Sequence, residues 1–149
     1  MADITVREDV TLISLHDSPA NIDAIAQVFR RISEAGIDVD MISQTLPNGQ
    51  HSNLSFTVGG DDFGGILRVA ASLRESCPDL KISVSSGNCK ISVRDDGMNG
   101  APGYAAKVFS AAADAHADIR MVTTSECDIS LLVVKADLDS TVQAIRAML

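Results

Sequence analysis

Alternating hydrophobic and polar positions predict a set of short β-strands in the first half of the chain. Residues 10–15 alternate and are rich in β-forming side chains, as is typical of a strand. Residues 39–44 and 54–58 predict two more strands, joined by the strong turn signal Leu46-Pro47-Asn48-Gly49. Residues 80–85 predict a fourth strand.

Two amphipathic helices are predicted between these strands. The first follows a polar turn at residues 17–19 and has Gly36 where a helix C-cap belongs. Its apolar positions recur at helical spacing at Ile22, Ile25, Ala26, Val28, Phe29 and Ile32. The second has Asp61 or Asp62 as its cap and is stopped by Pro78, and it carries Phe63, Ile66, Leu67, Val69, Ala70 and Leu73. The order βαββαβ predicts an antiparallel four-stranded sheet with both helices on one face.

The chain repeats this pattern at an offset of 80 residues, which indicates a duplicated unit. The identical pairs are Ala26/Ala106, Val28/Val108, Phe29/Phe109, Ala35/Ala115, Asp38/Asp118 and Met41/Met121. In the second copy, the strands are predicted at 90–94, 119–124 and 128–134, and the helices at 104–115 and 137–148. This copy is therefore one strand short.

The β-prone residues 4–6 can supply the missing strand, which also removes an open sheet edge. We therefore predict an α+β fold of two ferredoxin-like βαββαβ modules, with the first inserted in the second. The first module covers residues 9–86. The second combines residues 3–7 with residues 88–149.

Charge and composition exclude several classes of function. The net charge of −8 and the scattered Lys and Arg residues disfavour nucleic acid and anionic membrane surfaces as partners. No apolar run approaches the ~20 residues of a membrane-spanning helix. The N-terminus lacks the pattern of a signal peptide, so we expect a cytoplasmic protein.

Metal-binding and catalytic motifs are missing from the sequence. Three cysteines without CxxC spacing and three widely separated histidines disfavour a metal site, and no cofactor is implied. The segment Gly59–Gly65 is glycine-rich, but its two aspartates disfavour phosphate binding. Residues 95–97 lack the spaced oxygens of a calcium loop. We therefore expect no enzymatic activity.

Several segments resemble the C-terminal regulatory region of aspartokinases, which is a pair of ACT domains. Residues 36–44 resemble the family segment "GINVDMI.Q", and residues 53–58 resemble the strand "ISFTV". Residues 97–109 resemble "GM…PGVAAKVF", and residues 123–130 resemble "STSE.KIS". The resemblance covers nearly the whole sequence, but no segment resembles the catalytic domain of an aspartokinase.

The resemblance implies a small-molecule site in the first module. The second module is also a candidate because its Pro-Gly turn is intact, although in the family this copy more often supports the dimer than binds an effector. Effectors in the family contact the loop after the first strand, the start of the first helix and the next strand. In the first module these positions are Asn21, Ile22, Asp23, Val39, Asp40 and Gln44. In the second module they are Pro102, Gly103, Tyr104, Ser125 and Glu126. A helix N-terminus suits the carboxylate of an amino acid, and Asp40 or Asp23 suits its ammonium group.

The first module departs from the family at its ligand loop. The Pro-Gly positions of the family fall on Ile22 and Asp23, or residues 17–20 form a longer loop without the glycine. Either departure changes the expected specificity, because glycine permits a close backbone approach to a ligand. In the second module, His116 replaces the equivalent of Gly36.

Three functions are consistent with this sequence. The first is a non-catalytic regulatory protein that binds an amino acid, of which the lysine or threonine class is a candidate, and that shifts between conformations. The second is a separately encoded regulatory subunit that binds an aspartokinase catalytic chain. The third is a protein-interaction module that has lost its ligand. The family resemblance implies a homodimer in each case.

Overall fold

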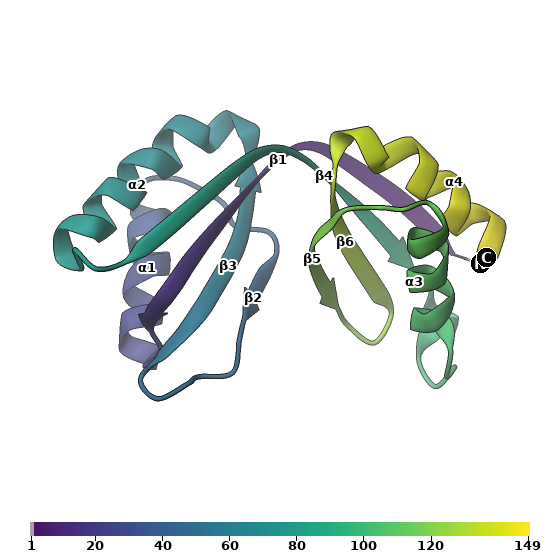
Figure 1. Ribbon diagram of the computed structural model, residues 1–149, viewed down its shortest axis with the longest axis horizontal. Coiled ribbons are helices and arrows are strands. Elements are labelled where there is room, and N and C mark those ends of the chain that lie inside the picture. Colours follow the sequence, from purple (N-terminus) through teal and green to yellow (C-terminus); the bar gives the residue numbers. More distant parts are fainter. Residues whose placement is uncertain (1) are drawn as a thin grey trace. The chain divides into compact units, whose positions relative to one another are not determined.

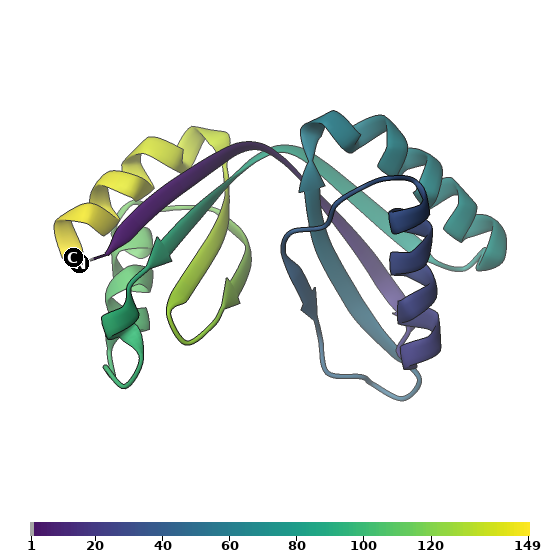
Figure 2. The same cartoon turned by 180° about the vertical axis from the view of Figure 1, so that it is seen from behind.

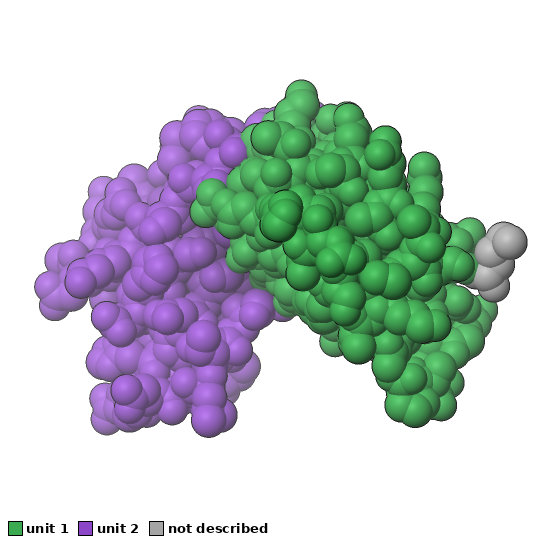
Figure 3. Space-filling view, turned by 45° about the vertical axis from the view of Figure 1, so that its right-hand side comes forward, with its two compact units in different colours: residues 1–9, 87–149 green, residues 10–86 purple. Residues whose placement is uncertain are grey.

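The computed structural model describes residues 2–149 and divides them between two compact units. Unit 1 comprises Met1–Asp9 and Gly87–Leu149, and unit 2 comprises Val10–Ser86. Figure 3 shows unit 1 in green and unit 2 in purple. Two long strands, β1 (Asp3–Pro19) and β4 (Lys81–Arg94), each contribute residues to both units.

Unit 2 has the strand order β2-β3-β1-β4. Strand β3 (His51–Gly59) pairs antiparallel with β1 and with the short β2 (Ile42–Gln44). Helices α1 (Ile22–Glu34) and α2 (Phe63–Ser76) cover one face of these strands (Figures 1 and 2). Alternate residues of the strands point toward the helices, so Ile13, Leu54 and Phe56 lie in the core with at most 2% of their surface exposed.

Unit 1 has the equivalent strand order, β1-β4-β6-β5. Strand β6 (Asp128–Val134) pairs antiparallel with β4 and with β5 (Ile119–Thr124). Helices α3 (Tyr104–Asp114) and α4 (Leu138–Met148) cover one face of these strands (Figure 1). The core is aliphatic, and its fully buried side chains include Ile91, Leu131 and Ile145.

Three short 3₁₀ segments complete the order of elements: η1 (Gly60–Asp62), η2 (Asp96–Met98) and η3 (Lys135–Asp137). Segments η1 and η3 precede α2 and α4 directly, which are equivalent helices of the two units. The α+β fold class with ferredoxin-like βαββαβ order is thus confirmed. In the part of the chain that the structure describes, no helix is long and apolar enough to cross a membrane.

The strands differ from the sequence prediction in length. Residues 4–6 and 10–15 were predicted as separate strands, but both belong to β1, and 80–85 and 90–94 both belong to β4. The predicted turn at residues 17–19 is also wrong, because β1 continues through it with a register shift and a positive φ of 52° at Asp17. Such irregularities interrupt the two-residue alternation on which the prediction relied.

The predicted helix ends agree with the structure except at one cap. Gly36 follows α1 with a φ of +74°, and His116 takes the same left-handed conformation after α3 with a φ of 54°. Asp62 occupies the N-cap position of α2, but its side chain makes no capping hydrogen bond within the described residues. The prediction of a side-chain cap there is therefore wrong, because the turn of η1 leads directly into the helix.

Candidate functional site

The structure brings the five candidates of the second module together around one cavity of unit 1. This cavity, which we call the loop cavity, has a volume of about 420 Å³. Its lining residues come from the segment before α3, from the start of α3 and from the β5–β6 turn. They are Met98, Asn99, Gly100, Ala101, Pro102, Gly103, Tyr104, Ala105, Thr124, Ser125, Glu126 and Ile129.

The Pro-Gly sequence shapes the helix end of the loop cavity. Gly103 is the N-cap residue of α3 and has a left-handed φ of 94°, a conformation that strains any residue with a Cβ atom. It has no side chain that could accept a hydrogen bond from the first turn of α3, and no other capping side chain is found among the described residues. The first backbone N–H groups of α3 are therefore available to an anion.

The β5–β6 turn contributes the polar side of the same cavity. Ser125 and Glu126 lie in this turn, which is closed by a 2.9 Å hydrogen bond from the Ser125 backbone N–H to the Asp128 carbonyl. Both side chains are exposed. Glu126 is the only charged residue among those that line the cavity. The cavity therefore combines a helix N-terminus, hydroxyl groups and one carboxylate.

A hydrogen bond between Asp95 and Tyr104 fixes the segment that leads into α3. The Tyr104 hydroxyl donates to Asp95 Oδ2 at 3.0 Å, and the Gly97 backbone N–H donates to Asp95 Oδ1 at 2.9 Å. The Gly97 bond, followed by the Tyr104 bond, lowers the pKa of the Asp95 carboxyl. Desolvation, followed by the bond to Asp95, raises the pKa of Tyr104.

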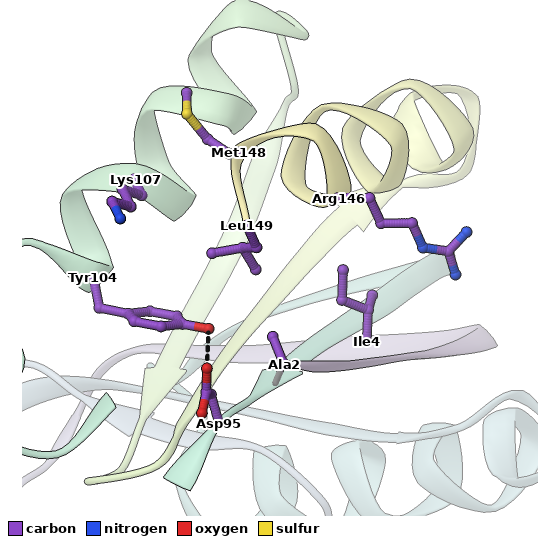
Figure 4. Close-up of a pocket in the computed structure, with 8 residues that line it drawn as sticks. All are labelled: Ala2, Ile4, Asp95, Tyr104, Lys107, Arg146, Met148 and Leu149. Atoms are coloured by element: carbon purple, nitrogen blue, oxygen red, sulfur yellow. Dashed lines mark hydrogen bonds between the residues drawn. The ribbon is translucent and has the colours of Figure 1, made fainter. Parts of the chain in front are cut away.

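A second cavity of unit 1 is lined by both members of this pair (Figure 4). It has a volume of about 490 Å³, and we call it the helix cavity. Its lining residues are Ala2, Ile4, Asp95, Tyr104, Lys107, Arg146, Met148 and Leu149. Figure 4 shows the Tyr104 ring extending from α3 toward Asp95 at the end of β4. Tyr104 lines both cavities.

Three of the six candidates of the first module make hydrogen bonds within unit 2. The Asn21 side chain caps α1 by accepting a 2.8 Å bond from the Ala24 N–H, so it occupies part of the helix N-terminus itself. Gln44 Nε2 donates to Ser52 Oγ at 3.1 Å. The Asp40 backbone N–H donates to the Thr57 carbonyl at 3.0 Å.

The other three candidates of the first module do not converge on a cavity described here. Val39 packs against the core of unit 2. Asp23 lies exposed in the first turn of α1, and Ile22 is 74% exposed. Two cavities of unit 2, of about 630 and 210 Å³, are lined by other residues. The five candidates of the second module therefore line one cavity, whereas the six of the first module line neither of these two cavities of unit 2.

Sequence reasoning missed several residues of the unit 1 cavities. Asp95 was considered only as a calcium ligand, although an aspartate two residues before a glycine is a typical signal for a side-chain bond to the backbone. Lys107 and Arg146 carried no local signal, since only the packing of α3 and α4 brings them to the helix cavity. Within residues 2–149, no group of three acidic, His or Cys side chains is arranged to hold a metal ion.

Comparison with known proteins identifies the type of module. Residues 91–149, which include most of unit 1, match the model of the ACT domain. The chain is 29% identical over 140 residues to an aspartokinase of Geobacillus stearothermophilus, a match that covers 94% of this chain and 33% of the relative. It is 26% identical over 142 residues to an aspartokinase of Bacillus sp. (strain MGA3), covering 95% of this chain and 34% of that protein. The chain thus spans about a third of the length of these relatives.

Solved structures give a closer match in length. The regulatory subunit of aspartate kinase from Thermus thermophilus superposes with a TM-score of 0.88 at 27% identity, covering 97% of this chain and 95% of that subunit. Aspartate kinase from Synechocystis gives a TM-score of 0.89 at 28% identity, but the match covers only 26% of that protein. Residues 91–149 therefore match the ACT domain, and the chain resembles, over nearly its whole length, the regulatory region of aspartokinases.

Proposed function

We propose that this chain is a non-catalytic regulatory protein that binds an amino acid in the loop cavity of unit 1. The observation that carries the proposal is the grouping of the free first turn of α3 with Ser125 and Glu126 in one cavity. The volume of about 420 Å³ lies in the range of small-molecule sites.

The charges in the loop cavity match the two ends of an amino acid. The N–H groups at the start of α3 can bind the carboxylate, because they have no side-chain cap within the described residues and lie at the positive end of the helix dipole. Glu126 can accept hydrogen bonds from the ammonium group. The lining residues include no Lys or Arg, so the cavity favours an amino acid whose side chain is not acidic.

Calorimetric titration with each common amino acid tests this proposal. We expect one of them to bind saturably, and Glu126→Gln to weaken its binding by about tenfold to a hundredfold, because a hydrogen bond to a charged group contributes roughly 1.5–3 kcal/mol. Asp23→Asn, in the first module, serves as the matched control and should leave the affinity unchanged. Loss of binding in the control alone would move the site to the first module.

A second candidate function is that of a regulatory subunit bound to an aspartokinase catalytic chain. The match to the Thermus thermophilus regulatory subunit, which covers 95% of that chain, supports it. Co-purification of a catalytic chain with this protein from its natural source is the discriminating measurement. If no amino acid binds the isolated protein and none binds the complex, the remaining interpretation is an interaction module without a ligand.

A further inference from the structure

One carboxylate holds both ends of the segment that forms most of the loop cavity. The oxygens of Asp95 accept hydrogen bonds from the Gly97 N–H at 2.9 Å and from the Tyr104 hydroxyl at 3.0 Å. Between these two donors lie residues 98–103, which all line the cavity. Figure 4 shows the bond that joins the end of β4 to the start of α3.

Two backbone hydrogen bonds also restrain this segment. The Met98 N–H donates to the Asp95 carbonyl at 3.0 Å, and the Ala101 N–H donates to the Met98 carbonyl at 3.1 Å. Residues 99–103 are exposed, and Gly100 and Gly103 both have left-handed φ values, of 75° and 94°. Because glycine loses more conformational freedom on ordering than other residues, this segment needs a specific tether to keep one shape.

We propose that Asp95 is a positioning residue for the loop cavity, and that its bond to the Tyr104 hydroxyl keeps the segment 97–104 in the conformation that binds ligand. The inference rests on the proposed function for the identity of the ligand, but not for the effect on the segment. Asp95 is not among the residues that line the loop cavity, and its hydrogen bonds to Gly97 and Tyr104 connect it to that cavity.

Tyr104 transmits this restraint to the cavity wall. It is the first residue of α3, so its position also sets the direction of the N–H groups that face the ligand. Tyr104 lines both cavities of unit 1. Removing the hydroxyl leaves the ring in place but frees the start of the helix from β4, and a cavity that is less preorganised binds its ligand more weakly.

Amide hydrogen exchange of the full chain, measured by NMR at Met98 and Ala101, tests the tether. The hydrogen bonds of these two amides do not involve the Asp95 side chain, so their exchange reports the order of the segment. We expect Asp95→Asn and Tyr104→Phe each to speed this exchange by about tenfold, the effect of losing one hydrogen bond. Asp96→Asn, the neighbouring carboxylate, is the matched control and should leave it unchanged.

Two further measurements separate positioning from general destabilisation. The double variant Asp95→Asn/Tyr104→Phe should loosen the segment no more than Asp95→Asn alone, because the bond that Tyr104→Phe removes is already lost in Asp95→Asn. Amide exchange in β6 should be unchanged in all variants. Additive effects, or faster exchange throughout unit 1, would overturn the proposal.

The effect on ligand binding is measured with the amino acid that binds in the calorimetric titration. We expect Tyr104→Phe and Asp95→Asn to weaken its binding by a similar factor, and an unchanged affinity in both would overturn the positioning role. If the wild-type protein binds no amino acid, the proposed function fails, whereas the exchange at Met98 and Ala101 still decides whether Asp95 holds the segment. Unchanged exchange in both variants contradicts the inference whatever the ligand.

Discussion

Phe29 on α1 meets Phe56 on β3 edge to face, with ring centroids 5.7 Å apart and ring planes at 62°. Phe56 is 1% exposed, and this contact joins the first helix of unit 2 to its central strands. In unit 1 the 80-residue repeat places Phe109, which is 38% exposed, at the position of Phe29. Leu131 takes the place of Phe56, because it pairs with Val122 as Phe56 pairs with Ile42. The same helical phenylalanine is therefore packed against an aromatic ring in one unit and partly exposed in the other.

The buried Phe56 and the partly exposed Phe109 should lower the free energy of unfolding by different amounts when they are replaced by alanine. We expect Phe56→Ala to lower the free energy of unfolding by about 3–5 kcal/mol, because it leaves a cavity in a closed core. Phe109→Ala should cost less than about 1.5 kcal/mol, since the side chain is already partly exposed. Chemical denaturation of both variants measures the two values. Equal costs would show that Phe109 is buried in solution, for example by a partner.

The pKa of Tyr104 gives a direct optical measurement of the Asp95 bond. The chain has one tyrosine and no tryptophan, so the phenolate absorbance reports Tyr104 alone. Burial and the Asp95 bond raise its pKa above the ordinary 10.0. We expect the midpoint of the absorbance titration to lie above pH 10 in the wild-type protein and to move down toward 10 in Asp95→Asn. A midpoint that does not move would show that Asp95 does not hold the hydroxyl.

The signs of the two pKa shifts define the pH range in which the pair stabilises unit 1. Since the folded pKa of Tyr104 is raised, its contribution is present below about pH 10 and is lost as the pH rises through the folded value. Since the folded pKa of Asp95 is lowered, its contribution is present above about pH 4 and is lost as the pH falls through the folded value. Thermal melts of the wild type and of Tyr104→Phe should differ most between these limits.

Mutation of Asn21 tests whether this residue of the first module stabilises the fold or binds a ligand. Because its side chain caps α1, Asn21→Ala should lower the free energy of unfolding by about 1 kcal/mol. The affinity for an amino acid should stay the same, since the proposed site lies in unit 1. Asn21→Ser keeps a capping oxygen and is the control for stability. A variant that is fully stable but binds less tightly would assign Asn21 to a ligand site.

The expected homodimer can be tested at an open sheet edge. Strand β2 is the edge of unit 2, and its three residues are exposed, including Ile42 at 50%. We expect sedimentation velocity to give about twice the chain mass of 15.7 kDa at micromolar concentration. Ile42→Lys should lower this mass if the edge lies in the interface, because a charge on an edge strand opposes pairing. Ser33→Lys, on the exposed side of α1, is the control.

Part of the candidate site was predictable because its signal is local. The Pro102-Gly103 dipeptide marks a helix start that needs a left-handed residue, and the sequence around Ser125 and Glu126 marks a turn between two strands. The role of Asp95 in holding the segment 97–104 was not predicted. Its partner Tyr104 is nine residues away, and no periodic pattern connects a strand end to a helix start at that distance.

The sequence by itself determined the element order, the duplication and the α+β class, because these follow from short-range periodicity. It placed β5 and β6 at 119–124 and 128–134, the bounds that the structure has. Tertiary structure alone decided that β1 and β4 run on as single long strands. Asp9 and Gly87 have positive φ values of 55° and 72°, which break the alternation of side chains locally. Only pairing with neighbouring strands carries the backbone through such points, and that pairing joins residues far apart in the chain.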